Sequence, residues 1–417
     1  MPPQLILNQR VSAEADEAID RLFPAQAVAE AAGAITNWAG YEPTPLVTLP
    51  GLAAGLGLAA IALKDESDRF GLGSFKALGG AYAVYCILRA HVTNRTGTVP
   101  TPANLESGSL AALTGEITVI CATAGNHGRS VAWAAGRFGC RCVILVHAGV
   151  TEERRAAMAR FGAEIREVPG SYDDSVREAA QLAAAHGWHL VPDTSTSEQD
   201  PIPALVMQGY TVMGAEIVDQ WRGPPPTHVF VQVGVGGLAA GVAEALWRRW
   251  RDELGHIVCV EPEAADCFAR SLAAGAPTPI SGDLDTLMLC LACGEVSAPA
   301  WAVLRPLATA AMTISDDETF DAMRRLADPA AGDPPLAAGE SGAAGLAGLI
   351  ALCRDDDRRR RLGLGPTARV LAIVSEGALD RALYDRVVGR GSADAESVRS
   401  DRIRREWNRL VISKSMN

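Results

Sequence analysis

Lysine is the residue that this sequence lacks most. Its 38 basic side chains include only three lysines, at positions 64, 76 and 414, and arginine fills the other basic positions. A site that needs only positive charge accepts either residue, whereas a site that needs a nucleophilic amine cannot use a guanidinium group, which stays protonated. Each lysine is therefore either an ordinary surface charge or a position that requires the amine itself.

Long apolar runs and an excess of positive charge are also missing. No apolar stretch approaches the ~20 residues of a membrane helix. The N-terminal segment MPPQLILNQR lacks the long apolar core of a signal peptide. The net charge of −11 argues against a nucleic-acid partner, because phosphates require a basic face. We therefore expect a cytoplasmic protein with a small-molecule partner that binds neither nucleic acid nor membrane.

The nine cysteines are odd in number and scattered over apolar segments, which is typical of reduced thiols in a cytosolic protein. Cys290 and Cys293 form a CxxC pair, but no second such pair accompanies it, so we expect no metal site. A redox pair remains open at these two positions.

At 417 residues the chain is long enough for about two domains. Strand and helix patterns alternate along it, which predicts an α/β fold with parallel sheets covered by helices. Ligand sites in such folds lie beyond the carboxyl ends of strands. The segments after Ala122, Val191, Val233 and Val374 are the places to search. Strands are expected at 117–122, 140–147, 163–168, 188–191, 227–233, 257–261 and 370–374.

Lys76 lies within GLGSFKALGG, residues 71–80, among small and apolar neighbours. Such neighbours desolvate an amine. Desolvation is expected to lower the pKa of the lysine and to free its lone pair for Schiff-base chemistry.

A glycine-rich turn from Gly234 to Gly241 follows a predicted strand and opens a helix. Backbone amides at such a turn bind phosphate. The spacing also matches a dinucleotide-binding fingerprint, with Glu261 at the end of the next strand. A purely structural tight turn is a third possibility, and the turn alone does not decide among the three.

Two further strand ends carry polar side chains. Asn126 and His127 follow one strand, where an amide donor can stabilise a phenolic oxygen, although a helix-capping turn explains them equally well. Ser375 ends a late strand, where its hydroxyl can hydrogen-bond a pyridine nitrogen without protonating it; alone, it is more typical of a turn.

The order GSFKALGGA, TAGNHG, GVGGLAAG and SEG resembles the fold-type II enzymes that depend on pyridoxal phosphate, such as threonine dehydratase and tryptophan synthase β. The resemblance covers residues 40–385 and implies a two-domain fold, with a mostly parallel twisted sheet flanked by helices in each domain. It also implies that Lys76 forms a Schiff base with the cofactor, that Asn126 lies beside the ring oxygen and that Ser375 meets the pyridine nitrogen. The phosphate would be bound by Gly234, Val235, Gly236, Gly237 and Leu238.

Motifs outside this core resemble the diaminopropionate ammonia-lyases. They are KDESDRFGL before the lysine, DT at 193–194, MQGY at 207–210, LACGE at 291–295 and GESGA at 339–343. This resemblance implies that 2,3-diaminopropionate is converted to pyruvate and ammonia. The residues expected to contact the substrate are Ser74, Thr123, Ala124, Gly125, His127 and Asp193.

Two of these positions bear on the substrate. The family usually has an aspartate, associated with proton abstraction from the D-isomer, where this chain has Ala124, as threonine dehydratases do. A methyl group cannot act as a base, so either one stereoisomer is handled or the substrate differs. Asp193 aligns with a second family acid that could bind the β-amine or act as a base; an aspartate that only caps a turn is equally consistent with the sequence.

The same resemblance sets the expected organisation. Residues 1–85 and 211–385 would form a large cofactor-binding domain, residues 86–210 a small mobile domain, and residues 386–417 a helical extension. Cys267 and Cys293 fall where close relatives carry cysteines, and either a disulfide or two free thiols fits. Apolar residues recur at helical spacing in the extension and would suit a homodimer interface; they are Ile403, Trp407, Leu410 and Val411.

These observations predict a pyridoxal-phosphate-dependent ammonia-lyase in which Lys76 and Asp193 are catalytic. A serine, threonine or hydroxyaspartate dehydratase shares every cofactor residue and differs only in the leaving group. A nicotinamide oxidoreductase would leave GSFK and AGNHG unexplained. A protein that only senses amino acids is the non-catalytic alternative, and the intact lysine argues against it.

Overall fold

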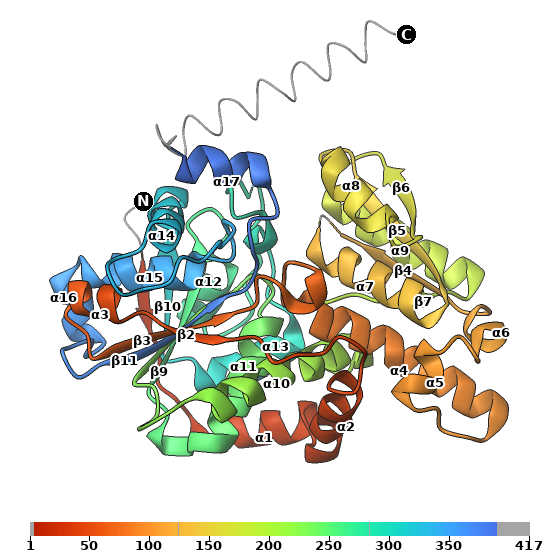
Figure 1. Ribbon diagram of the computed structural model, residues 1–417, viewed down its shortest axis with the longest axis horizontal. Coiled ribbons are helices and arrows are strands. Elements are labelled where there is room, and N and C mark those ends of the chain that lie inside the picture. The colour runs from red at the N-terminus through yellow and green to blue at the C-terminus, as the bar shows by residue number, and fades with distance from the viewer. Residues whose placement is uncertain (1–3, 124, 283, 390–417) are drawn as a thin grey trace, which may run out of the picture.

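Two separate sheets organise the chain, as the computed structural model shows (Figure 1). The structure describes residues 4–123, 125–282 and 284–389. Ala124 and the apolar positions of the C-terminal extension, from Ile403 to Val411, therefore lie outside the described residues. The two sheets confirm the predicted α/β fold.

The larger sheet has seven strands in the order β1-β10-β9-β8-β11-β3-β2. Its five central strands are parallel, whereas β1 and β2 pair antiparallel at the two edges. Leu5–Leu7 thus form one edge of this sheet. The strands are β1 (Leu5–Leu7), β2 (Leu46–Thr48), β3 (Ala60–Asp65), β8 (His228–Gln232), β9 (His256–Pro262), β10 (Ala310–Ile314) and β11 (Arg369–Val374).

The smaller sheet has four parallel strands in the order β6-β5-β4-β7. All four fall where the alternating pattern predicted strands. They are β4 (Thr118–Ala122), β5 (Arg141–His147), β6 (Glu164–Val168) and β7 (His189–Leu190).

Helices cover both sheets, and several begin at a side-chain cap. Thr151 accepts a hydrogen bond from the Arg154 amide at the start of α8. The helices are α1 (Ser12–Leu22), α2 (Ala25–Ile35), α3 (Pro50–Leu56), α4 (Lys76–Thr96), α5 (Pro102–Glu106), α6 (Ala111–Thr114), α7 (Asn126–Phe138), α8 (Glu152–Ala159), α9 (Tyr172–His186), α10 (Pro201–Gln220), α11 (Gly237–Trp250), α12 (Cys267–Ala274), α13 (Ala298–Leu307), α14 (Asp316–Ala327), α15 (Ala344–Cys353), α16 (Asp356–Arg361) and α17 (Arg381–Val388). Short 3₁₀ turns lie at Arg69–Gly71, Arg251–Glu253 and Leu289–Leu291.

Apolar side chains on both faces of the larger sheet are buried. Along β8, Val229 and Val231 join the core beneath α10 and α11, whereas Phe230 points to the opposite core beneath α15. The alternation follows from the period of two in a strand, and a strand buried on both faces is typical of a parallel sheet between helix layers.

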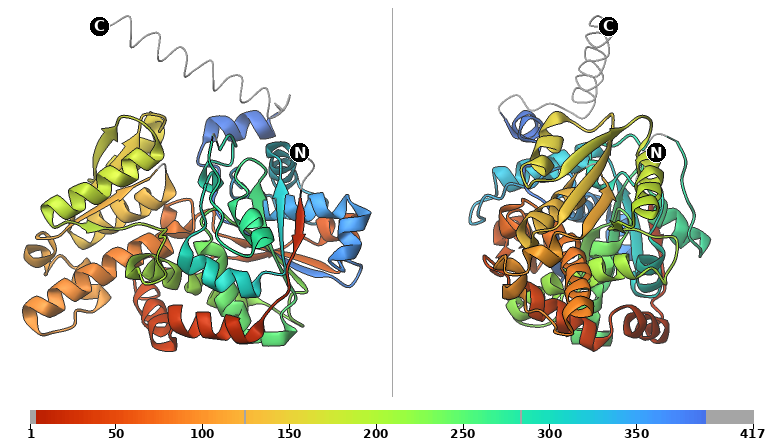
Figure 2. Two further views of the ribbon diagram at one scale, coloured as in Figure 1. Left: turned by 180° about the vertical axis from the view of Figure 1, so that it is seen from behind. Right: turned by 90° about the vertical axis from the view of Figure 1, so that its right-hand side faces the viewer.

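Helix α4 links the two bodies that contain the sheets (Figures 1 and 2). It packs on α7 beside the smaller sheet and on α10 beside the larger one. Glycines allow the close crossing with α10: a Cβ at Gly209 would lie 2.1 Å from the Leu78 carbonyl oxygen, and one at Gly79 would lie 2.5 Å from the Tyr210 ring. The position of Lys76, at the start of α4, is therefore set by α10.

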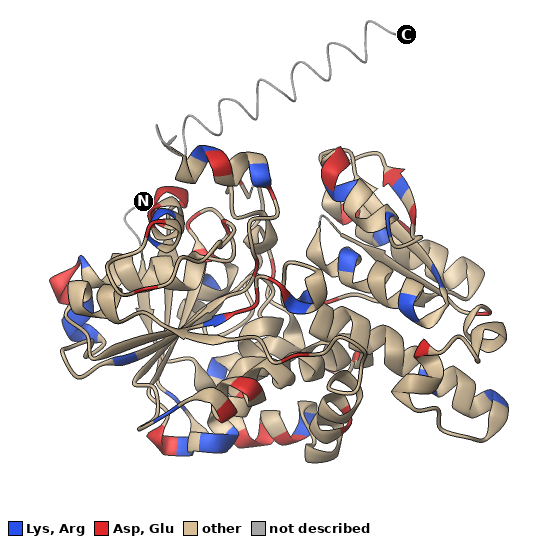
Figure 3. Ribbon diagram, viewed as in Figure 1, with Lys and Arg blue, Asp and Glu red and all other residues tan. Residues whose placement is uncertain are grey.

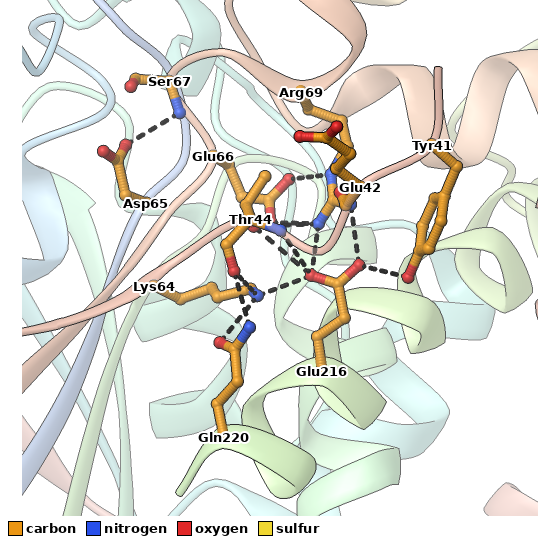
Figure 4. Close-up of polar contacts among 10 residues, drawn as sticks. All are labelled: Tyr41, Glu42, Thr44, Lys64, Asp65, Glu66, Ser67, Arg69, Glu216 and Gln220. Atoms are coloured by element: carbon orange, nitrogen blue, oxygen red, sulfur yellow. Dashed lines mark hydrogen bonds and ion pairs between the residues drawn. The ribbon is translucent and has the colours of Figure 1, made fainter. Parts of the chain in front are cut away.

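A buried ionic network joins α10 to the strand that leads toward Lys76 (Figure 4). Glu216 on α10 accepts hydrogen bonds from Lys64 at 2.6 Å and from Arg69 at 2.7 Å, and Arg69 also donates to Glu66 at 2.6 Å. All four side chains are buried. Two cations face two anions, so each ion depends on its partners for compensation after the loss of water.

Charged residues of both signs are interspersed over the outer helices (Figure 3). The charged segment Asp356–Arg361 forms α16, which has no buried residue, and its cap Asp355 accepts hydrogen bonds from the amides of Asp357 and Arg358. Within the described ranges, no helix is both long and apolar enough to cross a membrane.

Candidate active site

The loop before Lys76 pairs with the residues that follow β11. The Phe75 amide donates to the Ser375 carbonyl at 3.1 Å, and the Gly377 amide donates to the Gly73 carbonyl at 3.0 Å. Lys76 then begins α4. The pairing places Lys76 and Ser375, which are far apart in the sequence, at one edge of the larger sheet, as the position of strand ends predicted.

Lys76 forms an ion pair with Asp193, which follows β7 of the smaller sheet. The Lys76 Nζ donates to Asp193 Oδ2 at 2.6 Å, and both side chains are mostly buried. Burial alone would lower the pKa of Lys76, but the charge and the hydrogen bond of Asp193, together with Tyr210 and Cys290, outweigh burial and hold that pKa well above its usual range. The expected lowering is therefore wrong for this state of the protein. The same pair holds the pKa of Asp193 below its usual range, against the effect of burial.

The turn after β4 brings His127 beside this pair. His127 Nε2 is 2.7 Å from the Val191 carbonyl oxygen, whereas Nδ1 is 3.9 Å from Asp193 Oδ2 and has no hydrogen-bond partner. Burial lowers the pKa of His127, with Asp193 opposing, so the ring is neutral at neutral pH. The Thr123 hydroxyl accepts hydrogen bonds from the amides of Gly125 and Gly128 and fixes the shape of the turn.

Asn126 opens α7 and reaches across to the larger sheet. Its Nδ2 donates to Glu376 Oε2 at 2.5 Å, and the Cys290 thiol donates to the same oxygen at 3.4 Å. Because a carboxylate only accepts, Glu376 determines which end of the Asn126 amide faces it. The backbone of Ser74 bridges to Glu376. Sequence analysis missed this role of Glu376, since the residue was noticed only as part of the SEG motif.

A second glutamate lies next to this group. Glu340 is buried, and its Oε1 is 3.8 Å from Arg154 of the smaller body. Burial and the charge of Glu376 raise the pKa of Glu340 to about 8, although Arg154 opposes them. Glu340 therefore carries a proton at neutral pH.

The glycine-rich turn connects β8 to α11 with its amides at the helix N-terminus. Gly236 has φ +101°, and a Cβ there would lie 2.9 Å from Ala300. Both facts require glycine at this position. Gly234, Val235, Gly237 and Leu238 complete the turn. A helix N-terminus preceded by such a turn is suited to an anionic group such as a phosphate.

The dinucleotide interpretation of this turn is wrong. Glu261, which would have to contact a ribose, accepts hydrogen bonds from the amides of Phe268 and Ala269 at 2.8 and 2.7 Å and so caps α12. It is fully buried. A carboxylate committed to a helix start inside the core is not available to a ribose hydroxyl.

Ser375 is buried beneath the site and bonded to Gln232. The Gln232 Nε2 donates to Ser375 Oγ at 2.7 Å, which leaves the serine proton able to point elsewhere. The Gln232 Oε1 is buried without a hydrogen-bond partner. Gln232 ends β8, and sequence analysis missed it because a single buried glutamine in an apolar strand carries no recognisable pattern.

The cysteines of interest have separate environments. Cys267 and Cys293 are both free thiols, as are Cys290 and the others of the described chain. The thiol of Cys267 contacts Glu261 at 3.7 Å, and Cys293 lies against Gly234. The disulfide allowed by the resemblance is not formed in this structure. No group of three or more potential metal-ligating side chains occurs among the described residues.

The residues brought together fit a bound pyridoxal phosphate. Three buried polar atoms around the site have no partner in the protein: His127 Nδ1, Gln232 Oε1 and the Tyr210 hydroxyl. Buried polar atoms are rarely left unpaired unless a ligand or water completes them. The lysine amine can bond to the aldehyde of the cofactor, and the glycine-rich turn can bind its phosphate. The neutral serine hydroxyl can hydrogen-bond its pyridine nitrogen.

Comparison with known proteins agrees with this chemistry. The family model for pyridoxal-phosphate dependent enzymes matches residues 38–376. The diaminopropionate ammonia-lyase of Escherichia coli strain K12 is 41% identical, over 85% of this chain and 89% of the relative. That of Salmonella typhimurium is 36% identical, over 84% and 89%.

A solved structure agrees as well. The crystal structure of the Escherichia coli diaminopropionate ammonia lyase in complex with D-serine superposes with a TM-score of 0.83 and 36% identity, covering 93% of this chain and 97% of that one. The chain therefore belongs to the pyridoxal-phosphate dependent enzymes and, within them, to the diaminopropionate ammonia-lyase family.

Proposed function

We propose that this protein is a pyridoxal-phosphate-dependent ammonia-lyase that converts 2,3-diaminopropionate to pyruvate and ammonia. The observation that carries the proposal is the Lys76–Asp193 pair, 2.6 Å apart, which joins the two sheets at their carboxyl edges. A reactive amine and an acid in contact are what a substrate with an acidic Cα proton and a cationic β-amine requires.

The chain's own residues would hold the cofactor at four points. Lys76 would attach it covalently, the turn from Gly234 to Leu238 would bind its phosphate, Asn126 would face the ring oxygen and Ser375 the ring nitrogen. When bound, pyridoxal phosphate withdraws electrons from the substrate and makes its Cα proton acidic.

Proton transfer then falls to Lys76 and Asp193. The Lys76 amine, once released, is placed to take the Cα proton from one side. Asp193 keeps a negative charge beside that amine, so it can hold the β-ammonium group in the protonated form in which ammonia leaves. Ser375 presents a neutral hydroxyl that cannot protonate a pyridine nitrogen, which favours β-elimination over racemisation.

The turn after β4 would receive the substrate carboxylate. Thr123, Gly125 and His127 would form one wall of this carboxylate site, and Ser74, in the loop before Lys76, would contribute to it. Ala124, expected on the same wall, is assigned from the sequence alone. A carboxylate placed here would meet the N-terminal end of α7, where negative charge is favoured.

The function is tested by supplying the L- and D-isomers of diaminopropionate in separate assays and measuring the release of pyruvate and ammonia from each. Because Ala124 replaces the acid associated with the D-isomer, the L-isomer should react much faster, and Ala124→Asp should raise the D-isomer rate selectively. A protein that leaves both isomers unchanged would contradict the proposal. Equal rates on both would show that another acid replaces the missing one.

A dehydratase is the second candidate, because Ala124 is the residue found there in threonine dehydratases. It would use the same cofactor residues with a hydroxyl leaving group. A panel of β-substituted amino acids, including serine, threonine and hydroxyaspartate, separates the two: a higher kcat/KM for a hydroxy amino acid than for diaminopropionate would favour the dehydratase.

We further propose the division into a large domain (1–85 and 211–385), a small mobile domain (86–210) and a C-terminal extension (386–417), with a homodimer in the cytoplasm. The smaller sheet, whose strands span 118–190, supports the proposed boundary. Sedimentation of the full chain, compared with a chain ending at residue 389, tests the role of the extension in dimer formation.

A further inference from the structure

Tyr210 lies between the element assigned to the aldehyde of the cofactor and the element assigned to its phosphate. Its ring packs 4.8 Å from the Phe75 ring, directly before Lys76, and against the first turn of α4 at Gly79. Its other edge faces α11, where a Cβ at Gly237 would lie 3.6 Å from the ring. One side chain therefore contacts both the lysine helix and the glycine-rich turn.

The Tyr210 hydroxyl has no hydrogen-bond partner although the residue is only 1% exposed. Leaving a buried hydroxyl unpaired is unfavourable, and phenylalanine would fill the same space without that cost. Lys76 is close enough to lower the pKa of Tyr210 by its charge and by a hydrogen-bond interaction, but its amine is directed at Asp193, to which it donates at 2.6 Å, so the hydroxyl has no well-formed partner. Packing explains the ring of Tyr210 and leaves its hydroxyl unexplained.

The hydroxyl is a donor under all physiological conditions. Burial, opposed by Lys76, raises the pKa of Tyr210 to about 12, so the proton is retained at neutral pH. A neutral O–H donor is suited to an anionic oxygen, with which it forms a strong, charge-assisted hydrogen bond. The glycine-rich turn beside the ring is the anion-binding element of the site.

We propose that the Tyr210 hydroxyl is a ligand of the cofactor phosphate, donating to an oxygen that is held by the turn from Gly234 to Leu238. The proposal rests on the proposed function only through the cofactor. It assigns a side-chain donor to a phosphate site that otherwise consists of backbone amides, and it accounts for a hydroxyl that the protein itself leaves unpaired.

Tyr210→Phe tests the proposal because it removes the hydroxyl and keeps the ring. Tyr82→Phe is the matched control: Tyr82 is also buried, on α4, and its hydroxyl faces Cys86 on the same helix. The full-length proteins are freed of cofactor and titrated with pyridoxal phosphate and with pyridoxal, which lacks the phosphate. The Tm of each cofactor-free protein is measured in parallel.

Tyr210→Phe should bind pyridoxal phosphate roughly 10-fold more weakly or worse, the effect of one hydrogen bond to a charged group, while its affinity for pyridoxal stays unchanged. Its cofactor-free Tm should not fall, because the Lys76 amine beside the hydroxyl keeps its hydrogen bond to Asp193. Tyr82→Phe should bind both compounds as the wild type does.

Three results would overturn the proposal. The first is an unchanged affinity of Tyr210→Phe for pyridoxal phosphate. The second is an equal loss of affinity for pyridoxal phosphate and for pyridoxal, which would assign the hydroxyl to the Lys76 amine. The third is a lower Tm of the cofactor-free variant. Failure of the wild type to bind pyridoxal phosphate at all is a different outcome and would refute the proposed function itself.

Discussion

At the scale of single residues, the charge of Asp193 decides the state of the Lys76 amine. Burial and the carboxylate act on the lysine pKa in opposite directions, and the carboxylate, 2.6 Å away, prevails together with the smaller contributions of Tyr210 and Cys290. Sequence reasoning predicted a lowered pKa from desolvation alone, and the sign of that prediction is wrong. Asp193 is distant in sequence, and its contact with the lysine exists only because the two sheets meet at this edge.

Asp193→Asn should lower the pKa of Lys76, because burial then acts without the opposing carboxylate. Only the neutral amine attacks an aldehyde, so the pH midpoint for covalent attachment of pyridoxal phosphate to the cofactor-free protein should move to lower pH. The attachment is followed by visible absorbance. Asp173→Asn, in the exposed first turn of α9, is the control and should leave the midpoint unchanged. A midpoint that does not move in Asp193→Asn would contradict this reasoning.

The same ion pair makes stability depend on pH. The folded-state pKa of Asp193 is depressed, so its contribution is present above the unfolded value of ~3.9 and is lost as pH falls toward the folded value. The Tm difference between cofactor-free wild type and Asp193→Asn should therefore shrink on acidification below about pH 4. A difference that grows in acid would show that the pair is not formed.

At the scale of elements, the contacts between α4, α10 and β3 position the reactive lysine. Glu216 is the centre of the buried network, and Glu216→Gln would leave Lys64 and Arg69 with Glu66 as their remaining carboxylate. An uncompensated buried charge costs about 3–5 kcal/mol, so the midpoint of thermal or urea unfolding should fall clearly. Glu198→Gln breaks the exposed pair with Arg21 and should cost less than about 1 kcal/mol. An equal loss of stability in Glu216→Gln and Glu198→Gln would contradict the burial of the Glu216 network.

The close crossing of α4 and α10 can be tested with two glycine variants that should change the free energy of unfolding in opposite directions. Gly209→Ala would place a methyl group 2.1 Å from the Leu78 carbonyl oxygen and should destabilise the protein by about 1–3 kcal/mol or more. Gly33→Ala, in α2, meets nothing within 4 Å and should stabilise by about 0.5–1 kcal/mol, as alanine does in an open helix position. If unfolding curves show that both variants change stability in the same direction, the close crossing of α4 and α10 would be refuted.

At the scale of the whole molecule, local patterns predicted the alternation of strands and helices, and they predicted Asn126 and Ser375 because each follows a strand end. The scarcity of lysine and the small, apolar neighbours of Lys76 predicted that residue. They could not predict which distant side chains complete the site. Tyr210 lies in the interior of a mostly apolar helix and Gln232 in a buried strand, so neither carries a local signal. Lys64 illustrates the same limit: a charge in a strand is normally exposed, and only the fold shows it buried against Glu216.

Covalent attachment of the cofactor to Lys76 is the central claim, and borohydride reduction followed by peptide mass mapping tests it most directly. The reduced label should be found on the peptide that contains Lys76, and Lys76→Arg, which keeps the charge but not the nucleophilic amine, should carry none. A label on Lys64 or Lys414, or a wild-type protein without any label, would contradict the account.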